Sequence, residues 1–257
     1  MNKQSTISIV IHTWNEEKNI RECIENARLL SPDIIVVDME SSDGTLDIVK
    51  ELKVPFFSTP YKRYVEPARN FGIHKSGGDW VFILDADERL TPKLVTELRQ
   101  STVESDCTYV KIPRIEVFNK KHKLLHGGWS SAPQIRFIKK NAFINWPSVI
   151  HSFPEIKGEF KIANSHMFHY SQGDFSMMVE KTSRYEDIEA GLLYEAKRPV
   201  VVATFFRKWI AELYRRMIKN LGFLDGTSGV IVSLYQAYSK TITYLFLYEK
   251  YEKNSGH

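Results

Sequence analysis

The sequence predicts an α/β protein in which a mainly parallel sheet is flanked by helices and followed by a helical C-terminal extension. Over the first 105 residues, short apolar runs of strand type alternate with segments of helical spacing, which is the pattern of βαβ units. Further along, to Tyr170, short strand-like runs are separated by loops rich in glycine and proline. From Phe175 onward the spacing is helical almost to the end.

The strands expected in the first part carry consecutive apolar side chains, as strands buried on both faces do. They are Ile7–Ile11, Ile34–Val37, Val54–Phe57 and Trp80–Leu84. The helices expected between and after them cover residues 16–30, 45–52 and 68–75 and a segment that begins at Thr91-Pro92. The last helix has a threonine as its cap and a proline at its first position, a typical helix start.

The second part predicts strands at 109–115, 134–139 and 167–170, and the helical part is interrupted at 198–199 and 222–229. These changes of pattern divide the chain into three segments. Residues 1–105 are expected to form a nucleotide-binding half, residues 106–173 a mixed region suited to an acceptor pocket, and residues 174–257 a helical extension.

The composition excludes several classes of protein. A net charge of +4 over 257 residues is too small to indicate nucleic-acid binding. Two cysteines, Cys23 and Cys107, provide no disulfide framework, so we expect a cytoplasmic protein in a reducing compartment. The N-terminus has no signal-peptide pattern, and no apolar stretch is long enough for a transmembrane helix.

Polar side chains follow three of the expected strands, at 12–17, 38–45 and 85–88. The carboxyl ends of parallel strands meet at one edge of a sheet, where open α/β sheets bind ligands. Asp85 and Asp87 are separated by a single alanine and suit a divalent cation that bridges to substrate phosphates. No glycine-rich phosphate loop is present, so a metal would compensate the charge of a diphosphate. The alternative is an acidic turn that caps the helix at Pro92, with Asp38 as an ordinary turn residue.

Four segments in this order resemble the inverting family-2 glycosyltransferases of the GT-A fold, a Rossmann-like architecture. They are ISIVIHTWNEE at 7–17, IIVVDMESSDGT at 34–45, ARNFG at 68–72 and GDWVFILDADER at 78–89. Weaker matches at PQIRF (133–137), His151 and HMFHY (166–170) resemble the small bacterial branch that includes lipopolysaccharide-core glucosyltransferases. The resemblance implies transfer of a sugar from a nucleotide sugar, with a UDP-sugar favoured, to a glycan or lipid-linked acceptor in cell-surface polysaccharide or lipopolysaccharide synthesis.

The resemblance also implies roles for individual residues. The base and ribose pocket would contain Thr13, Asn15, Glu16 and Asp38. Asp38 would accept a hydrogen bond from the base. The family usually has a second acid and a glycine after this aspartate, where this chain has Met39 and Glu40, which leaves the base specificity open.

For the diphosphate and the metal, the resemblance places Arg69 near the diphosphate and Asp85 against the ribose or the metal. Asp87 would be the main ligand of Mn²⁺ or Mg²⁺, and His169 a further ligand. A histidine also serves as an ordinary hydrogen-bonding residue, so a structural role for His169 is the alternative.

The expected reaction is a single displacement that needs a general base for the acceptor hydroxyl. The family often has a His-Glu pair near His151, where this chain has His151-Ser152. The candidates for the base are therefore Glu155, His151 and Asp174. Trp129, which follows two glycines, suggests a mobile loop with an aromatic platform for a sugar, or alternatively a buried tryptophan beside a tight turn.

Residues 201–221 form an amphipathic pattern. Its apolar face comprises Phe206, Trp209, Ile210, Leu213, Met217 and Leu221, and basic residues cluster on the other side, at Arg207, Lys208, Arg215, Arg216 and Lys219. Such a helix is typical of a membrane surface, which would give peripheral contact through residues 201–248 on the inner face of the cell membrane. The alternative is a pair of ordinary helices packed on the sheet.

Two other functions fit parts of the pattern. A HAD-type phosphatase also has an Asp-x-Asp at a strand end, but it expects Thr or Val where this chain has Arg89. A membrane- or polyanion-binding module without catalytic activity would explain the basic tail and the missing glutamate after His151.

Overall fold

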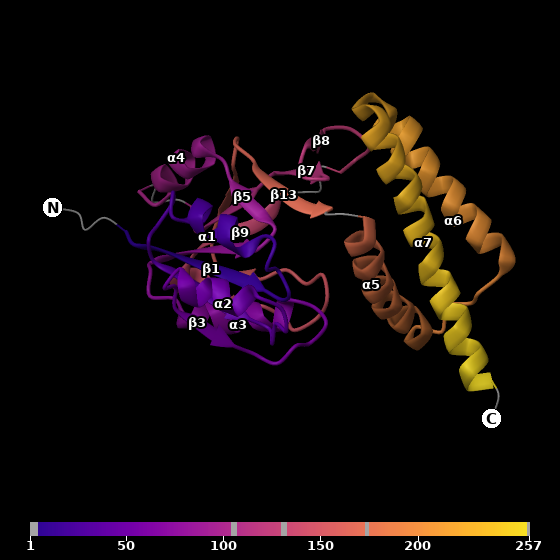
Figure 1. Cartoon of the computed structure of the whole chain (residues 1–257), viewed down its shortest axis with the longest axis horizontal. Coiled ribbons are helices and arrows are strands. Elements are labelled where there is room, and N and C mark those ends of the chain that lie inside the picture. The colour runs from indigo at the N-terminus through magenta and orange to yellow at the C-terminus, as the bar shows by residue number, and fades with distance from the viewer. Residues whose placement is uncertain (1–4, 104–106, 130–132, 173–174, 256–257) are drawn as a thin grey trace. The chain divides into compact units, whose positions relative to one another are not determined.

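The computed structural model describes residues 5–103, 107–129, 133–172 and 175–255 and divides the chain into two compact units (Figure 1). The first unit comprises Met1–Arg114 and Ser131–His169, and the second comprises Ile115–Ser130 and Tyr170–His257. The expected middle region, 106–173, is therefore shared between the two units. Its strands extend the sheet of the first unit, and a short hairpin within it belongs to the second unit.

Seven strands of the described residues form the main sheet of the first unit, in the order β12-β6-β9-β4-β1-β2-β3. Four of them are parallel, as predicted: β1 (Ile7–Thr13), β2 (Ile34–Asp38), β3 (Phe56–Ser58) and β4 (Trp80–Asp85). The other three are β6 (Tyr109–Ile112), β9 (Gln134–Lys139) and β12 (Phe160–Ile162). Strand β9 runs antiparallel to both β4 and β6, which brings part of the middle region directly beside the strand that ends in Asp85.

Helices cover both faces of this sheet. They are α1 (Ile20–Ala27), α2 (Thr45–Glu51), α3 (Glu66–Lys75) and α4 (Pro92–Ser101). Alternate strand residues such as Ile9 and Ile11 pack with α1, α2 and α4, whereas Val10 packs on the other face with α3. This alternation follows from the two-residue period of a strand. The predicted cap of α4 is present, because the Thr91 side chain accepts a hydrogen bond from the Leu94 amide.

Smaller strand pairs complete the first unit. Strand β5 (Glu88–Leu90) pairs antiparallel with β13 (Met167–Gln172), and His169 lies opposite Glu88 in this register. Strand β10 (Phe143–Asn145), which follows the 3₁₀ turn η1 (Lys140–Ala142), pairs with β11 (Glu155–Ile156). The strand predicted over 109–115 is broken at Pro113, because a proline has no N–H for the strand ladder.

The second unit is mainly helical. It contains the hairpin of β7 (Arg114–Phe118, whose first residue belongs to the first unit) and β8 (His122–Leu124). Its helices are α5 (Phe175–Glu195), α6 (Val202–Tyr214), the π-helical turn η2 (Arg215–Lys219), the 3₁₀ turn η3 (Gly222–Asp225) and α7 (Gly226–Ser255). Helix α7 packs against both α5 and α6 and runs between them (Figure 1). Among the described residues, no helix combines the length and apolar character needed to cross a bilayer.

Candidate active site

The strand register of the first unit brings the predicted polar residues together. Thr13 lies beside Asp38 in the β1–β2 pair, and His12 lies beside Asp85 in the β1–β4 pair. The ends of three parallel strands therefore meet at one edge of the sheet, as expected from the sequence.

Unpaired polar atoms mark the part of this edge formed by β1 and β2. Asp38 is fully buried; its Oδ2 accepts a 3.0 Å hydrogen bond from the Ser41 amide, while its Oδ1 has no partner in the described part of the chain. The hydroxyl of Thr13 is likewise buried without a partner among the described residues. Buried polar atoms of proteins are nearly always hydrogen-bonded. Two neighbouring polar atoms without partners at the strand ends therefore indicate a place for a ligand.

Asn15 and Glu16 hold the two loops of this edge together. Asn15 adopts a left-handed backbone with φ of 52°, and its amide donates a 2.9 Å hydrogen bond to the Ser41 hydroxyl. Its side-chain oxygen accepts a hydrogen bond from the Ser42 amide, at 2.8 Å. The Glu16 amide donates to the Thr45 hydroxyl at 2.9 Å. The two loops therefore keep a fixed relation around Asp38.

An aromatic stack beside these loops was not anticipated from the sequence. The rings of Trp14 and Tyr61 lie 4.3 Å apart and nearly parallel, and the Tyr61 amide donates to the Glu40 carboxylate at 3.2 Å. The Tyr61 hydroxyl is a further buried polar atom without a partner among the described residues. Met39, which replaces an acid of the family pattern, is buried in the core on one face of the sheet.

Asp85 lies between two arginines. Both of its carboxylate oxygens accept hydrogen bonds from Arg69 at 3.1 Å, and its Oδ2 also accepts one from Arg136 at 2.6 Å. Burial by itself would raise the pKa of Asp85, but Arg136 and Arg69 outweigh it and hold this pKa well below its usual range. Both oxygens of Asp85 are thus engaged by guanidinium groups in this structure. Its role as a metal ligand stays a prediction.

The same network includes a buried glutamate that sequence reasoning missed. Glu88 is fully buried, and its Oε1 accepts hydrogen bonds from Arg136 at 2.8 Å and from Arg114 at 3.1 Å. Its Oε2 accepts one from the Asp85 amide. Arg136 therefore bridges two carboxylates, which keep its pKa above the usual value although burial alone would lower it. The only sequence signal for Arg136 was its place within the PQIRF segment.

Asp87, in the turn between β4 and β5, approaches His169 of β13. The Oδ1 of Asp87 lies 3.4 Å from Nε2 of His169, and both side chains are mostly buried. A carboxylate oxygen and an imidazole nitrogen at this separation fit two positions around Mn²⁺ or Mg²⁺, which take their remaining ligands from phosphates and water. The described residues contain no group of three or more such side chains that could hold a metal alone. The pair is thus suited to a metal shared with a diphosphate.

His12 is a buried neutral side chain next to this network. Burial first, and then the nearby Arg69, lower its pKa from 6.5 to about 3. Its Nε2 lies 3.3 Å from the carbonyl oxygen of Ala68, to which it can donate, and its Nδ1 is buried without a partner among the described residues. His12 therefore links β1 to the start of the ARNFG segment without adding charge.

Two of the three expected general bases, His151 and Glu155, lie among the described residues of the first unit. His151 is exposed, has a left-handed backbone with φ of 60°, and its amide donates to Glu66 at 2.8 Å. Glu155 is exposed on β11, opposite Asn145. Asp174 lies outside the described residues.

Trp129 belongs to the core of the second unit. It packs with Leu124 and Val232, and the Arg216 guanidinium lies 4.0 Å from its ring centre. Arg216 also donates hydrogen bonds to the carbonyl oxygens of Gly127 and Gly128. The expected sugar platform on a mobile loop is therefore corrected to the alternative, a buried tryptophan beside a tight turn.

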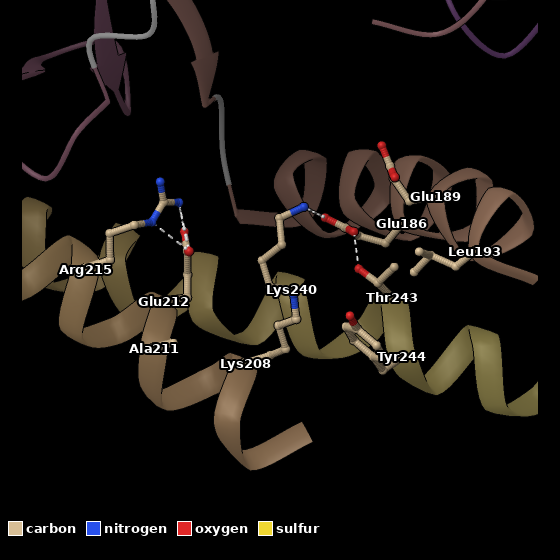
Figure 2. Close-up of a pocket in the computed structure, with 10 residues that line it drawn as sticks. All are labelled: Glu186, Glu189, Leu193, Lys208, Ala211, Glu212, Arg215, Lys240, Thr243 and Tyr244. Carbon is tan, nitrogen blue, oxygen red and sulfur yellow. Dashed lines mark hydrogen bonds and ion pairs between the residues drawn. The ribbon is translucent and has the colours of Figure 1, made fainter. Parts of the chain in front are cut away.

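A cavity of about 380 Å³ lies between α5, α6 and α7 (Figure 2). Its charged lining residues are Glu186, Glu189, Glu212, Lys208, Arg215 and Lys240. Glu186 accepts hydrogen bonds from Lys240, Thr243 and Ser239, and Glu212 is held by Arg215. Because acidic and basic groups are equal in number and these two acids are paired, we assign no chemistry to this cavity.

A mainly parallel sheet with helices on both faces and polar residues gathered at its strand ends is the arrangement that the GT-A fold of glycosyltransferases also has. The sequence profile described as Glycosyl transferase family 2 matches residues 8–168, well over half of the chain. The chain belongs to this family and is a glycosyltransferase. The HAD-type phosphatase alternative is therefore wrong.

Similar proteins agree with this assignment. An uncharacterized glycosyltransferase of Rickettsia conorii is 22% identical over 93% of this chain and 89% of its own length. Another, of Rickettsia prowazekii, is 26% identical over 91% of this chain and 84% of its own. Among solved structures, the mannosyltransferase PcManGT from Pyrobaculum calidifontis, in complex with GDP-Man and Mn²⁺, shares the fold with a TM-score of 0.51. It is 13% identical, and the match covers 99% of this chain and 88% of that one.

Proposed function

We propose that this enzyme transfers a sugar, with inversion, from a nucleotide-sugar donor to a hydroxyl of a glycan or glycolipid acceptor in cell-surface polysaccharide or lipopolysaccharide synthesis. The observation that carries the proposal is the Asp87–His169 pair, 3.4 Å apart, beside an aspartate already neutralised by two arginines. The site thus combines a place for a divalent ion with positive charge where a diphosphate would leave.

A base with a single N–H at N3, such as uracil or thymine, fits the base pocket better than guanine, and the family resemblance favours uridine. Among the described residues, Oδ1 of Asp38 lacks a partner, whereas Oδ2 accepts from the Ser41 amide. Uracil presents one N–H, at N3, whereas guanine presents two adjacent donors that pair best with both oxygens of a carboxylate. Asn15, Glu16 and the Thr13 hydroxyl would complete the pocket for base and ribose. The Pyrobaculum enzyme, in contrast, is in complex with GDP-Man.

Asp87 and His169 would hold Mn²⁺ or Mg²⁺, which, when bound, stabilises negative charge on the diphosphate. Arg69 supports this region with its own charge. Its Nε and Nη1 groups are buried and have no partner among the described residues, so donors remain for the diphosphate. The role of Asp85 is to orient Arg69 and Arg136, and its contact with the ribose stays a prediction.

In the reaction, the acceptor oxygen attacks the anomeric carbon on the face opposite the diphosphate. The bond from the anomeric carbon to the phosphate oxygen breaks, and the nucleoside diphosphate leaves with the bonding electrons. The acceptor proton passes to a general base, which contributes typically 10²–10⁴-fold. We propose His151, Glu155 or Asp174 for this role; single alanine variants of each, assayed at saturating donor, identify the residue whose loss lowers kcat most.

A panel of UDP-, dTDP-, GDP- and CMP-sugars with and without Mn²⁺, measured by released nucleotide, tests the proposal. We expect release from a UDP-sugar that requires the metal and is lost in Asp87→Asn and in His169→Gln. The matched controls are Asp47→Asn, an exposed aspartate on α2, and His166→Gln, three residues before His169. Metal-independent release, or equal loss in the controls, would contradict the metal assignment.

If the panel shows neither turnover nor metal-dependent nucleotide binding, the result favours the non-catalytic binding module instead. A lipid-linked acceptor would place the enzyme at the cytoplasmic face of the cell membrane. The two cysteines, Cys23 and Cys107, are both free and buried, which suits a reducing compartment.

A further inference from the structure

Helix α6 carries an apolar stripe that the fold leaves exposed. Phe206, Ile210, Tyr214 and Ile218 follow one another at intervals of four residues through α6 and η2, and each is between 55% and 67% exposed. Residues four apart lie on the same side of a helix. The amphipathic pattern predicted Leu213 and Met217 on this side of the helix, but both are half-buried in the structure. Tyr214 and Ile218 are exposed there instead.

Helix α7 carries a second stripe. Ile231, Leu234, Tyr238, Leu245 and Tyr248 recur at the three- and four-residue steps of one helix side and are 40% to 51% exposed. The short connection between α6 and α7 adds three more exposed apolar residues, Leu221, Phe223 and Leu224. We call these twelve side chains the apolar face of the helical unit.

Both stripes lie on the side of their helix opposite to the cavity of Figure 2. Ile210 follows Lys208 and precedes Glu212 by two residues, which is about half a turn from either of these cavity-lining residues. Leu245 likewise follows the cavity-lining Thr243 by two residues. Since α6 and α7 pack against each other and line the same cavity, their stripes share one face of the unit.

The charge of the chain is concentrated in the same region. Residues 201–257 contain eight Lys and Arg against four Asp and Glu, which equals the whole net charge of +4, so the preceding 200 residues are neutral in sum. Of these basic residues, Lys208, Arg215 and Lys240 line the cavity on the opposite side, and Arg216 is buried. Arg207 and Lys219, in contrast, are exposed and directly follow Phe206 and Ile218 of the α6 stripe.

We propose that the apolar face docks on an anionic phospholipid bilayer, with α6 and α7 lying in its interface. Soluble proteins rarely expose contiguous apolar patches of this extent. Apolar and aromatic side chains flanked by Lys and Arg are typical of helices in the plane of a membrane surface, and each basic residue is attracted by anionic headgroups. The inference rests on the proposed function in one respect: a lipid-linked acceptor would be found at the same membrane surface.

A second copy of this chain is the other occupant to consider, because the steps along α7 resemble those of a coiled-coil seam. The excess of positive charge disfavours this, since two copies would bring like charges together, whereas an anionic surface is complementary to them.

Co-sedimentation of the full chain with vesicles tests the proposal. We expect binding to phosphatidylcholine–phosphatidylglycerol vesicles, weak binding to phosphatidylcholine alone, and weakening by high salt. Phe206→Ser/Ile210→Ser should weaken vesicle binding by about tenfold or more. Arg207→Glu/Lys219→Glu should abolish the preference for the anionic vesicles. The matched control is Leu29→Ser/Val103→Ser, which removes two exposed apolar side chains of the first unit.

Circular dichroism and release of nucleotide from the donor are measured on every variant. Lost vesicle binding with unchanged helical content and donor turnover supports the apolar face. Equal vesicle binding by the wild type and the Phe206/Ile210 variant overturns the proposal, and so does an absence of vesicle binding by the wild type. A dimer in sedimentation velocity that this variant dissociates, in the absence of vesicle binding, would show that a second copy covers the face instead. Absent turnover with intact vesicle binding rejects the proposed function and leaves this inference standing.

Discussion

Arg136 donates a 2.6 Å hydrogen bond to Asp85, although 51 residues separate the two along the chain. The same guanidinium reaches Glu88 at 2.8 Å, so one arginine from β9 neutralises the carboxylates at the end of β4 and the start of β5. Asp87 lies instead 3.4 Å from His169. The different surroundings of the two aspartates of the Asp-Ala-Asp segment therefore depend on a strand that follows it by about 50 residues.

Substitution of Arg136 should be costly. In Arg136→Met, buried Glu88 and Asp85 lose a shared partner, and we expect the free energy of unfolding to fall by about 3 kcal/mol, as for other broken buried ion pairs. Urea denaturation measures this change. The control Arg21→Met removes an exposed pair with Glu51 and should lower the free energy of unfolding far less than Arg136→Met does. Equal effects in the two variants would show that the network does not stabilise the fold.

His12 should make the protein sensitive to acid. Its pKa is lowered from 6.5 to about 3 in the folded state, so the unfolded chain binds one more proton between these values. Stability is therefore complete above about pH 6.5 and is lost as the pH falls toward 3. Between about pH 7.5 and about pH 5.5 this histidine should account for a loss of about 1.4 kcal/mol.

The variant His12→Gln should remove this part of the pH dependence, measured as the difference between urea midpoints at the two pH values. His74→Gln, at an exposed position near the end of α3, is the control and should keep the wild-type slope. A wild-type slope in His12→Gln would mean that His12 is protonated in the folded protein.

Two neighbouring glycines before β4 should differ in their tolerance of alanine. A Cβ on Gly78 would lie 2.6 Å from the backbone nitrogen of Ser8, whereas a Cβ on Gly77 would meet nothing within 4 Å. We expect Gly78→Ala to lower the free energy of unfolding by about 1–3 kcal/mol through overpacking. Gly77→Ala should change it by less than about 0.5 kcal/mol. Chemical denaturation of the two variants measures both free energies of unfolding. Equal values would indicate that β1 shifts freely to accommodate the methyl group.

Asp38→Asn should reduce affinity for uridine nucleotides. The Asn oxygen can still accept from the Ser41 amide, but an N–H group then replaces Oδ1, which is proposed to accept a hydrogen bond from the base. We expect the Kd of UDP to rise about tenfold to 100-fold, the value of a hydrogen bond to a charged group. Isothermal titration with UDP and GDP measures this, with Asp47→Asn as control. A loss of GDP binding that exceeds the loss of UDP binding would reverse the predicted base preference.

Local patterns sufficed to predict much of the fold. Strands such as Ile7–Thr13 and Trp80–Asp85 consist mainly of apolar residues, and the capping residue Thr91 directly precedes the helix that begins at Pro92. These signals are local because the backbone geometry of a helix or a strand fixes which residues within a few positions of one another share a face. The chain order of the four family segments sufficed to assign the glycosyltransferase class, which the family match confirms.

The sequence by itself thus determined the parallel sheet, its acidic edge and the family. Only the tertiary structure decided that β9 inserts antiparallel beside β4, that Arg136 neutralises Asp85, and that Trp129 is buried beneath Arg216. Likewise, an amphipathic pattern predicts an apolar helix side but not whether anything covers it. The physical reason is common to all of these: they depend on contacts between residues far apart in the chain, whose pairing is set by the packing of the whole fold and leaves no periodic signal along the sequence.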